Sequence, residues 1–184
     1  MKRKDILGIK DLNKTELNEI LTVADGMRNM LDRGERSTEL RNRNVATLFY
    51  ENSTRTRNSF ELAAKNLGAT TTSLSVATSS VQKGESLIDT GKTLDALGTD
   101  VMIIRHPVAG APRLLADNVT ASVLNAGDGI NEHPSQALLD VLTAKRRFGG
   151  LAGLKVVIVG YIYHSRVARS DKLCFTRLGA TVTI

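Results

Sequence analysis

The pattern of apolar and polar positions predicts strands and helices that alternate along most of the chain. Apolar residues recur at helical spacing after Asn13, and Asn13 followed by Glu16 resembles a capping box, so the chain should open with an amphipathic helix. Short apolar runs typical of buried strands then alternate with longer helical stretches. The expected strands are 45–50, 70–76, 101–104 and 122–125, and the expected helices are 54–67, 87–97, 113–116 and 134–148. This alternation indicates an α/β fold, with a parallel sheet and helices on both faces.

A second α/β unit is expected to begin near residue 150. Three glycines between residues 149 and 153 form a plausible hinge. The elements expected after them are a strand at 155–159, a helix from about Ser165 and a strand at 180–184. Two strands and one helix cannot cover their own sheet faces. The sequence therefore predicts a first domain at 1–149 and an incomplete second domain at 150–184.

Composition favours a soluble globular protein of the cytoplasm. Of the 184 residues, 41% are hydrophobic and 24% are charged. The one cysteine, Cys174, cannot form an internal disulfide. No long apolar run follows the charged residues at the start of the chain, so neither a signal peptide nor a membrane span is expected.

The formal net charge of +6 suggests an anionic partner, which could be nucleic acid, membrane lipid or a phosphorylated metabolite. Basic residues are spread along the chain, aromatic residues make up only 4%, and there is no Trp. Nucleic-acid proteins that stack bases need clustered basic and aromatic side chains. We therefore expect a small anion as the ligand, with no nucleic-acid or membrane partner.

The first candidate site lies where an apolar strand meets a helix, at Ser53, Thr54, Arg55 and Thr56. Unpaired N–H groups and the positive end of the helix dipole favour a phosphate there, and the hydroxyl and guanidinium groups add donors. Arg57 is expected to point away. The spacing alone is equally compatible with an ordinary Ser/Thr cap beside solvated arginines.

Two more strand ends carry polar side chains. Arg105 stands at the carboxyl end of a strand, where open α/β sheets place their ligands, although a lone arginine there could also form a surface ion pair. His133 could donate a hydrogen bond to a carbonyl oxygen, and the Gln136 amide could hold the nitrogen of a small carbonyl compound. Taken alone, they could be a capping His and a surface Gln. Because three neighbouring sheet edges carry such donors, we expect one shared pocket.

Four motifs together resemble aspartate carbamoyltransferases, in the order and spacing of that family and over essentially the whole chain. They are Phe-Tyr-Glu-Asn-Ser-Thr-Arg-Thr-Arg-Asn-Ser-Phe-Glu at 49–61, Lys-Gly-Glu at 83–85, Arg-His-Pro at 105–107 and His-Pro-Ser-Gln at 133–136. Ornithine carbamoyltransferases share Ser-Thr-Arg-Thr-Arg and a His-Pro pair, but they typically have Arg-Glu in the first loop and a Cys after the Pro. The alternatives are an ornithine carbamoyltransferase, or a non-catalytic anion or nucleic-acid binding module on the same scaffold.

The resemblance implies transfer of the carbamoyl group from carbamoyl phosphate to the amino group of L-aspartate, in pyrimidine biosynthesis, with no metal or organic cofactor. It implies that Ser53, Thr54, Arg55 and Thr56 grip the phosphate. Arg105 would contact the phosphate and the carbonyl oxygen, Thr56 and His133 would polarise that carbonyl, and Gln136 would hold the carbamoyl nitrogen. Arg166 keeps the position that binds an aspartate carboxylate. The implied catalytic residues are Arg55, Thr56, Arg105 and His133.

The resemblance also implies a homotrimer in which Ser79 and Lys83 act in a neighbouring subunit's site. Regulatory or dihydroorotase chains as further partners are left open. The sequence departs from the family pattern at Tyr161, which stands in place of an acidic residue, and bulky rings at Tyr161 and Tyr163 could misplace Arg166. Family members continue through the rest of an aspartate domain and a returning helix. We therefore expect this chain to bind carbamoyl phosphate weakly, with little turnover.

Overall fold

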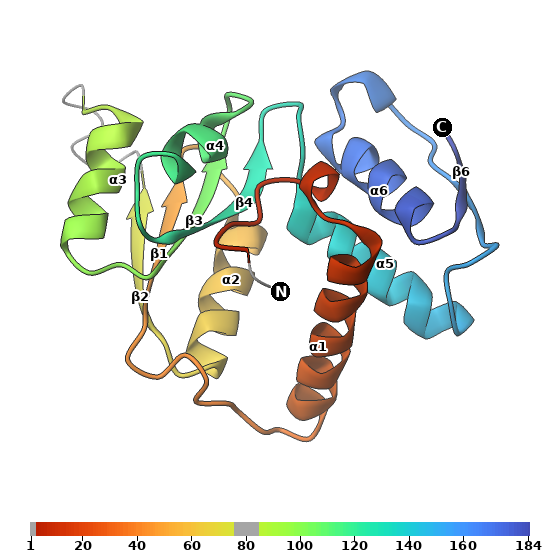
Figure 1. Cartoon of the computed structure of the whole chain (residues 1–184), viewed down its shortest axis with the longest axis horizontal. Helices are drawn as coiled ribbons and strands as arrows, with labels where there is room; N and C mark the ends of the chain where they lie inside the picture. The colour runs from red at the N-terminus through yellow and green to blue at the C-terminus, as the bar shows by residue number, and fades with distance from the viewer. Residues whose placement is uncertain (1–2, 76–84) are drawn as a thin grey trace.

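A four-stranded parallel sheet forms the centre of the N-terminal part (Figure 1). The computed structural model describes residues 3–75 and 85–184. The sheet order is β2-β1-β3-β4, and Val45 of β1 pairs with Thr71 on one side and Val101 on the other. The strand bounds are β1 Asn44–Phe49, β2 Thr70–Ser75, β3 Val101–His106 and β4 Ser122–Asp128. This arrangement confirms the parallel sheet that the sequence predicts.

Helices cover both faces of this sheet, as expected. Because successive side chains of a strand point to opposite faces, Ala46 and Leu48 of β1 pack with α3 and α4, whereas Val45 and Phe49 pack with α2. The bounds are α2 Thr54–Asn66, α3 Leu87–Ala96 and α4 Ala111–Ala116. By the same alternation, Arg105 lies two residues after Ile103 and therefore on the face of the sheet that α2 covers.

The opening helix α1, Lys14–Asp32, begins as the sequence predicts. The Asn13 side chain accepts from the Glu16 backbone N–H, and the Glu16 side chain accepts from the Asn13 backbone N–H, which completes the capping box. Leu17 and Leu21 are the buried residues of this helix. A 3-10 turn, η1 Ile9–Asp11, precedes it.

The second unit contains a two-stranded parallel sheet, β5 Lys155–Val157 with β6 Thr181–Thr183, and the helix α6, Arg166–Arg177. A 3-10 turn, η4 Ile162–His164, leads into α6. Both strands are shorter than the expected 155–159 and 180–184. Among the described residues each strand pairs only with the other, over three residues in each.

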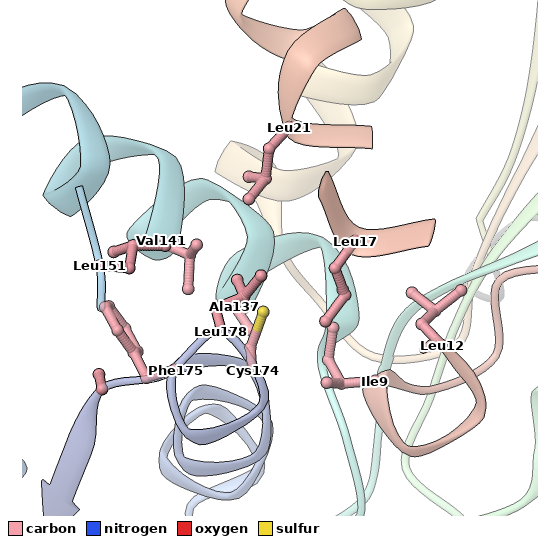
Figure 2. Packing of buried hydrophobic residues seen from close by; sticks show 11 residues of the cluster. Ile9, Leu12, Leu17, Leu21, Ala137, Val141, Leu151, Cys174, Phe175 and Leu178 are labelled. Carbon is pink, nitrogen blue, oxygen red and sulfur yellow. The ribbon is translucent and has the colours of Figure 1, made fainter. Parts of the chain in front are cut away.

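One hydrophobic cluster joins the second unit to the first (Figure 2). The helix α5, Pro134–Phe148, lies between α1 and α6 and contributes Ala137 and Val141. The fully buried or nearly buried members are Ile9, Leu12, Leu17, Leu21, Ala137, Val141, Leu151, Cys174, Phe175, Leu178 and Ala180. Because some of these residues precede position 150 in the sequence and others follow it, the two units share one hydrophobic core in this structure. The division into domains 1–149 and 150–184 stays a prediction.

A buried polar network fixes the start of α5 against the N-terminal segment. The Glu132 side chain, only 1% exposed, accepts from the Ile9 backbone N–H at 2.7 Å and from the Ser170 hydroxyl at 3.2 Å. The same Ser170 hydroxyl accepts from the His133 backbone N–H at 2.9 Å. The network therefore sets where His133 stands relative to α6. No helix in the described part of the chain is long and apolar enough to cross a membrane.

The loop after β4 depends on Gly129. This residue has φ +51, and a methyl group there would lie 2.8 Å from the Pro107 carbonyl oxygen and 3.0 Å from the Ala109 nitrogen. We expect Gly129→Ala to lower the free energy of unfolding by about 2–4 kcal/mol, because strain from the left-handed backbone adds to a backbone clash. Urea denaturation followed by circular dichroism measures this difference.

Gly98→Ala is the matched control for that substitution. Gly98 also has a positive φ, +84, but its added methyl group would meet open space among the described residues. A loss of about 1 kcal/mol is expected there from the backbone conformation alone. Equal losses for the two variants would show that the contact with Pro107 does not limit position 129.

Candidate active site

The start of α2 offers backbone donors that its own cap residue does not use. Ser53 occupies the N-cap position with extended backbone, φ −159 and ψ 92, but its side chain makes no capping hydrogen bond. At the start of α6, by contrast, the Ser165 hydroxyl accepts from the Ala168 N–H. The first-turn N–H groups of α2 are thus left for another acceptor. The structure confirms the predicted place of Ser53, Thr54, Arg55 and Thr56 at a helix N-terminus.

Arg57 makes a separate contact on the same helix. Its Nε lies 3.9 Å from Glu61 Oε1, one helical turn further on. Arg55 lines the pocket described below and is exposed. The two arginines therefore have different surroundings, as the sequence predicts.

Arg105 is held inside the site by a carboxylate. Its side chain is 12% exposed, and its Nη2 donates to Glu51 Oε1 at 2.7 Å. Glu51 follows β1 in the same way that Arg105 ends β3, so both stand at the carboxyl edge of the sheet. The sequence also allowed a surface ion pair for Arg105. An ion pair is present, but the Arg105 side chain is largely buried.

Glu51 also binds Arg166 across the two units. Arg166 donates from Nη2 to Glu51 Oε1 at 2.6 Å and from Nη1 to Glu51 Oε2 at 3.0 Å, and Nη1 also donates to the Gly129 carbonyl oxygen at 3.0 Å. Hydrogen bonds from Arg166, and then from Arg105, hold the pKa of Glu51 at about 2. One carboxylate thus pairs with two arginines that the sequence analysis assigned to ligands, and the three groups together keep a net positive charge.

His133 is buried at the start of α5, with 5% of its surface exposed. Burial first, and then the positive charges of Arg105 and Arg166, lowers its pKa to about 4. The imidazole is therefore neutral at physiological pH. Its Nδ1 lies 3.3 Å from the Ser135 hydroxyl. If Nδ1 accepts from that hydroxyl, the ring proton is on Nε2, which can then donate to a ligand.

Side chains from α2 and α5 meet in one pocket of about 510 Å³. Its lining residues are Arg55, Thr56, Ser59, Phe60, Ala63, His133, Ser135, Gln136 and Leu139. Arg105 is not part of this lining, but its positive charge contributes to the lowered pKa of His133, which is part of it. The structure therefore brings together Arg55, Thr56, His133 and Gln136, as the sequence predicts.

Arg166 lines a second pocket of about 490 Å³, together with Glu51, Pro107, Gly129, His164, Ser165 and Val167. Tyr161 and Tyr163 are 74% and 75% exposed, and their ring centres lie 5.0 Å and 4.8 Å from that of His164. The rings therefore do not prevent Arg166 from reaching the sheet edge. A larger groove of about 870 Å³ runs along α1 and contains none of the predicted site residues.

Glu51 is the site residue to which sequence reasoning gave no role. It belongs to the motif at 49–61, and its position directly after a predicted strand is the signal that could have indicated a role in the site. Ser79 and Lys83 lie outside the described residues, so their role in a neighbouring subunit stays a prediction. Among residues 3–75 and 85–184, no group of three or more His, Cys, Asp or Glu side chains could hold a metal ion.

The ion pairs of Glu51 make a pH-dependent contribution to stability. Its pKa is about 2 in the folded chain and about 4.3 in an unfolded chain, so the contribution is complete above about pH 5 and is lost as pH falls towards 2. Because the Glu51 side chain is 34% exposed, we expect Glu51→Gln to cost only about 1 kcal/mol at pH 7. Urea denaturation of both proteins from pH 7 to pH 3 measures the difference.

Glu35→Gln serves as the control, because Glu35 pairs with Arg33 on the surface, where both side chains are more than half exposed. This change is expected to leave the free energy of unfolding nearly unchanged. If the gap between wild type and Glu51→Gln does not narrow as pH falls, the assigned ion pairs do not stabilise the fold.

The comparison with known families agrees with this geometry. The model of the family described as "Aspartate/ornithine carbamoyltransferase, carbamoyl-P binding domain" matches residues 4–146. The chain belongs to this family. The match covers the strands and helices that carry all of the described candidate residues except Arg166.

Curated relatives share the sequence at high identity. The aspartate carbamoyltransferase catalytic subunit of Acetivibrio thermocellus is 57% identical over 185 aligned positions, which cover 100% of this chain and 59% of that protein. The subunit of the same name from Moorella thermoacetica is also 57% identical, with 100% and 60% covered. The chain thus spans about three-fifths of the length of these relatives.

Solved structures share the fold. Aspartate transcarbamoylase from Trypanosoma cruzi in complex with carbamoyl phosphate and aspartate superposes with a TM-score of 0.90 at 32% identity, over 97% of this chain and 59% of that chain. The ligand-free form of the same enzyme superposes with a TM-score of 0.86 at 31% identity, over 96% and 56%. The likeness confirms the α/β fold predicted from the sequence.

Proposed function

We propose that this carbamoyltransferase-family chain belongs to a protein that transfers the carbamoyl group of carbamoyl phosphate to the amino group of L-aspartate. The products are N-carbamoyl-L-aspartate and phosphate. The observation that carries the proposal is the single pocket in which Arg55, His133 and Gln136 meet at the starts of two helices. The names of the curated relatives, and the two ligands of the Trypanosoma cruzi structure, support aspartate over ornithine as the acceptor.

The phosphate group is assigned to the N-terminus of α2. Free first-turn N–H groups, the hydroxyls of Ser53 and Thr54 and the exposed Arg55 guanidinium supply donors and positive charge. Charge-assisted hydrogen bonds to a phosphate are about twice as strong as neutral ones. When phosphate leaves the substrate, these N–H groups and the guanidinium already balance its negative charge.

The carbonyl group is assigned to His133, Thr56 and Arg105. When the amino group attacks the carbonyl carbon, negative charge develops on the oxygen, and donors already in place stabilise that charge without reorganising. The neutral imidazole of His133 can donate a proton in a hydrogen bond while Arg105 contributes full positive charge nearby. Gln136 is assigned to the carbamoyl nitrogen. Carbamoyl phosphate is already activated, so we assign no metal or cofactor to this step.

Arg166 is assigned to a carboxylate of aspartate. In the structure it makes two hydrogen bonds to the Glu51 carboxylate, and this pairing with a group of the same kind supports the assignment. We further propose a cytoplasmic homotrimer in which Ser79 and Lys83 act in a neighbouring site. Whether regulatory or dihydroorotase chains attach is left open.

Substitution of Arg55 tests the proposed phosphate site. Arg55→Ala should weaken binding of N-(phosphonacetyl)-L-aspartate and carbamoyl phosphate by about 10- to 100-fold, because charge-assisted hydrogen bonds to the phosphate end are lost. Isothermal titration calorimetry measures the dissociation constants. Arg147→Ala, at an exposed position in the last turn of α5, removes the same charge and should leave them unchanged.

Equal weakening by both substitutions would contradict a specific phosphate site. A non-catalytic nucleic-acid module gives another result: nucleic acid would bind, its affinity would fall steeply with salt, and the loss would be spread over many basic residues.

The chain by itself is expected to show little or no turnover. Its second unit contributes two short strands and one helix in the described structure, and Arg166 is the one residue there to which we assign aspartate binding. A steady-state assay of carbamoyl-aspartate formation tests this, with a full-length relative as the positive control. Ordinary turnover by this chain would contradict the expectation.

A further inference from the structure

Two carboxyl groups meet where α5 packs against α6. Asp140 of α5 and Asp171 of α6 are hydrogen bonded to each other, which requires that one of them carry a proton. Asp171 Oδ1 is buried and has no hydrogen-bond partner among the described residues, a situation that costs less for a neutral acid than for a carboxylate. Burial and the charge of Asp140 also raise the pKa of Asp171 to about 7. Asp171 is therefore the donor and Asp140 the carboxylate.

The Asp140 carboxylate in turn holds the side-chain amide of Gln136. Gln136 Nε2 donates to Asp140 Oδ1 at 3.1 Å and to Oδ2 at 3.2 Å. An ionised carboxylate only accepts hydrogen bonds, so the NH₂ group of the amide must face it. The amide oxygen Oε1 then faces away from Asp140, on a side chain that lines the pocket of Arg55 and His133.

We propose that Asp140 is a positioning residue that sets which ligands the pocket prefers. Its carboxylate fixes the Gln136 amide with the oxygen presented to the ligand, so the pocket selects a phosphorylated carbonyl compound that carries an N–H donor over one of the same shape with a methyl group. Asp171 keeps the Asp140 carboxylate in place. The inference rests on the proposed function, because it assumes that the carbamoyl group binds beside Gln136.

The preference follows from unequal costs. A ligand with a methyl group in place of the amide NH₂ leaves the Gln136 oxygen without a partner when it displaces water from the pocket. If the Gln136 amide were free to rotate, it could turn either end towards the ligand, and the preference would shrink. The orientation of the amide, and not its presence alone, is what Asp140 contributes.

Two phosphonates that differ only at this group test the inference. Phosphonoacetamide carries the NH₂ group, and 2-oxopropylphosphonate carries a methyl group in its place. Calorimetric titration at about pH 6, where Asp171 keeps its proton, should show that the chain prefers the amide by about tenfold. In Asp140→Leu the preference should fall to about twofold or less, while affinity for the methyl compound is unchanged.

Further variants separate orientation from folding. Asp140→Asn can turn either end of its own amide towards Gln136 and should give a preference between those of wild type and Asp140→Leu, whereas the exposed and remote Asp117→Ala should leave the preference unchanged. If Asp140→Leu does not fold, as judged by circular dichroism, Asp140→Ala takes its place with the same expectation.

The outcomes distinguish this inference from the proposed function. A wild-type chain that binds neither phosphonate removes the proposed function and the inference with it. A wild-type chain that binds both compounds equally, or an unchanged preference in Asp140→Leu, would overturn the inference alone.

Discussion

The site depends on one ion cluster, in which the Glu51 carboxylate holds both Arg105 and Arg166. The two guanidinium groups are only 12% and 14% exposed, so water screens their charges less than those of surface arginines, and a nearby counter-charge is favoured. Glu51 supplies that charge at the end of β1, between the sheet edge that carries Arg105 and the helix that carries Arg166. The cluster therefore ties the second unit to the pocket and keeps both arginines at the sheet edge where an anion would bind.

The same cluster helps to keep the His133 imidazole neutral. A buried histidine already prefers the neutral form, and two nearby positive charges strengthen that preference. The backbone N–H of His133 meanwhile donates to the Ser170 hydroxyl, and that hydroxyl donates to the Glu132 carboxylate. The protonation and the position of His133 thus depend on residues from several elements, so the pocket forms only when these elements are packed together.

The sequence predicted the features that are local. A short apolar run predicts a strand from neighbouring residues alone, and the capping box needs only Asn13 and Glu16, three positions apart. The strands of the first sheet and the start of α1 therefore lie where the sequence predicts them. The convergence of Arg55 and His133 was also predictable, because parallel strands bring their carboxyl ends to one edge. The early ends of β5 and β6 were not, since an apolar run does not reveal whether a neighbouring strand is present to pair with it.

Contacts between elements could not be predicted in the same way. Glu51 stands close in sequence to Arg55 and Arg57, yet its partners are Arg105 and Arg166, which only the folded arrangement brings near. The same holds for Gln136, whose amide is oriented by Asp140 one turn away, while Asp140 depends on Asp171 of another helix. His133 is the N-cap of α5, and α5 packs through Ala137 and Val141 into the core shared with α6, so a shift of either helix would move the imidazole and the amide together.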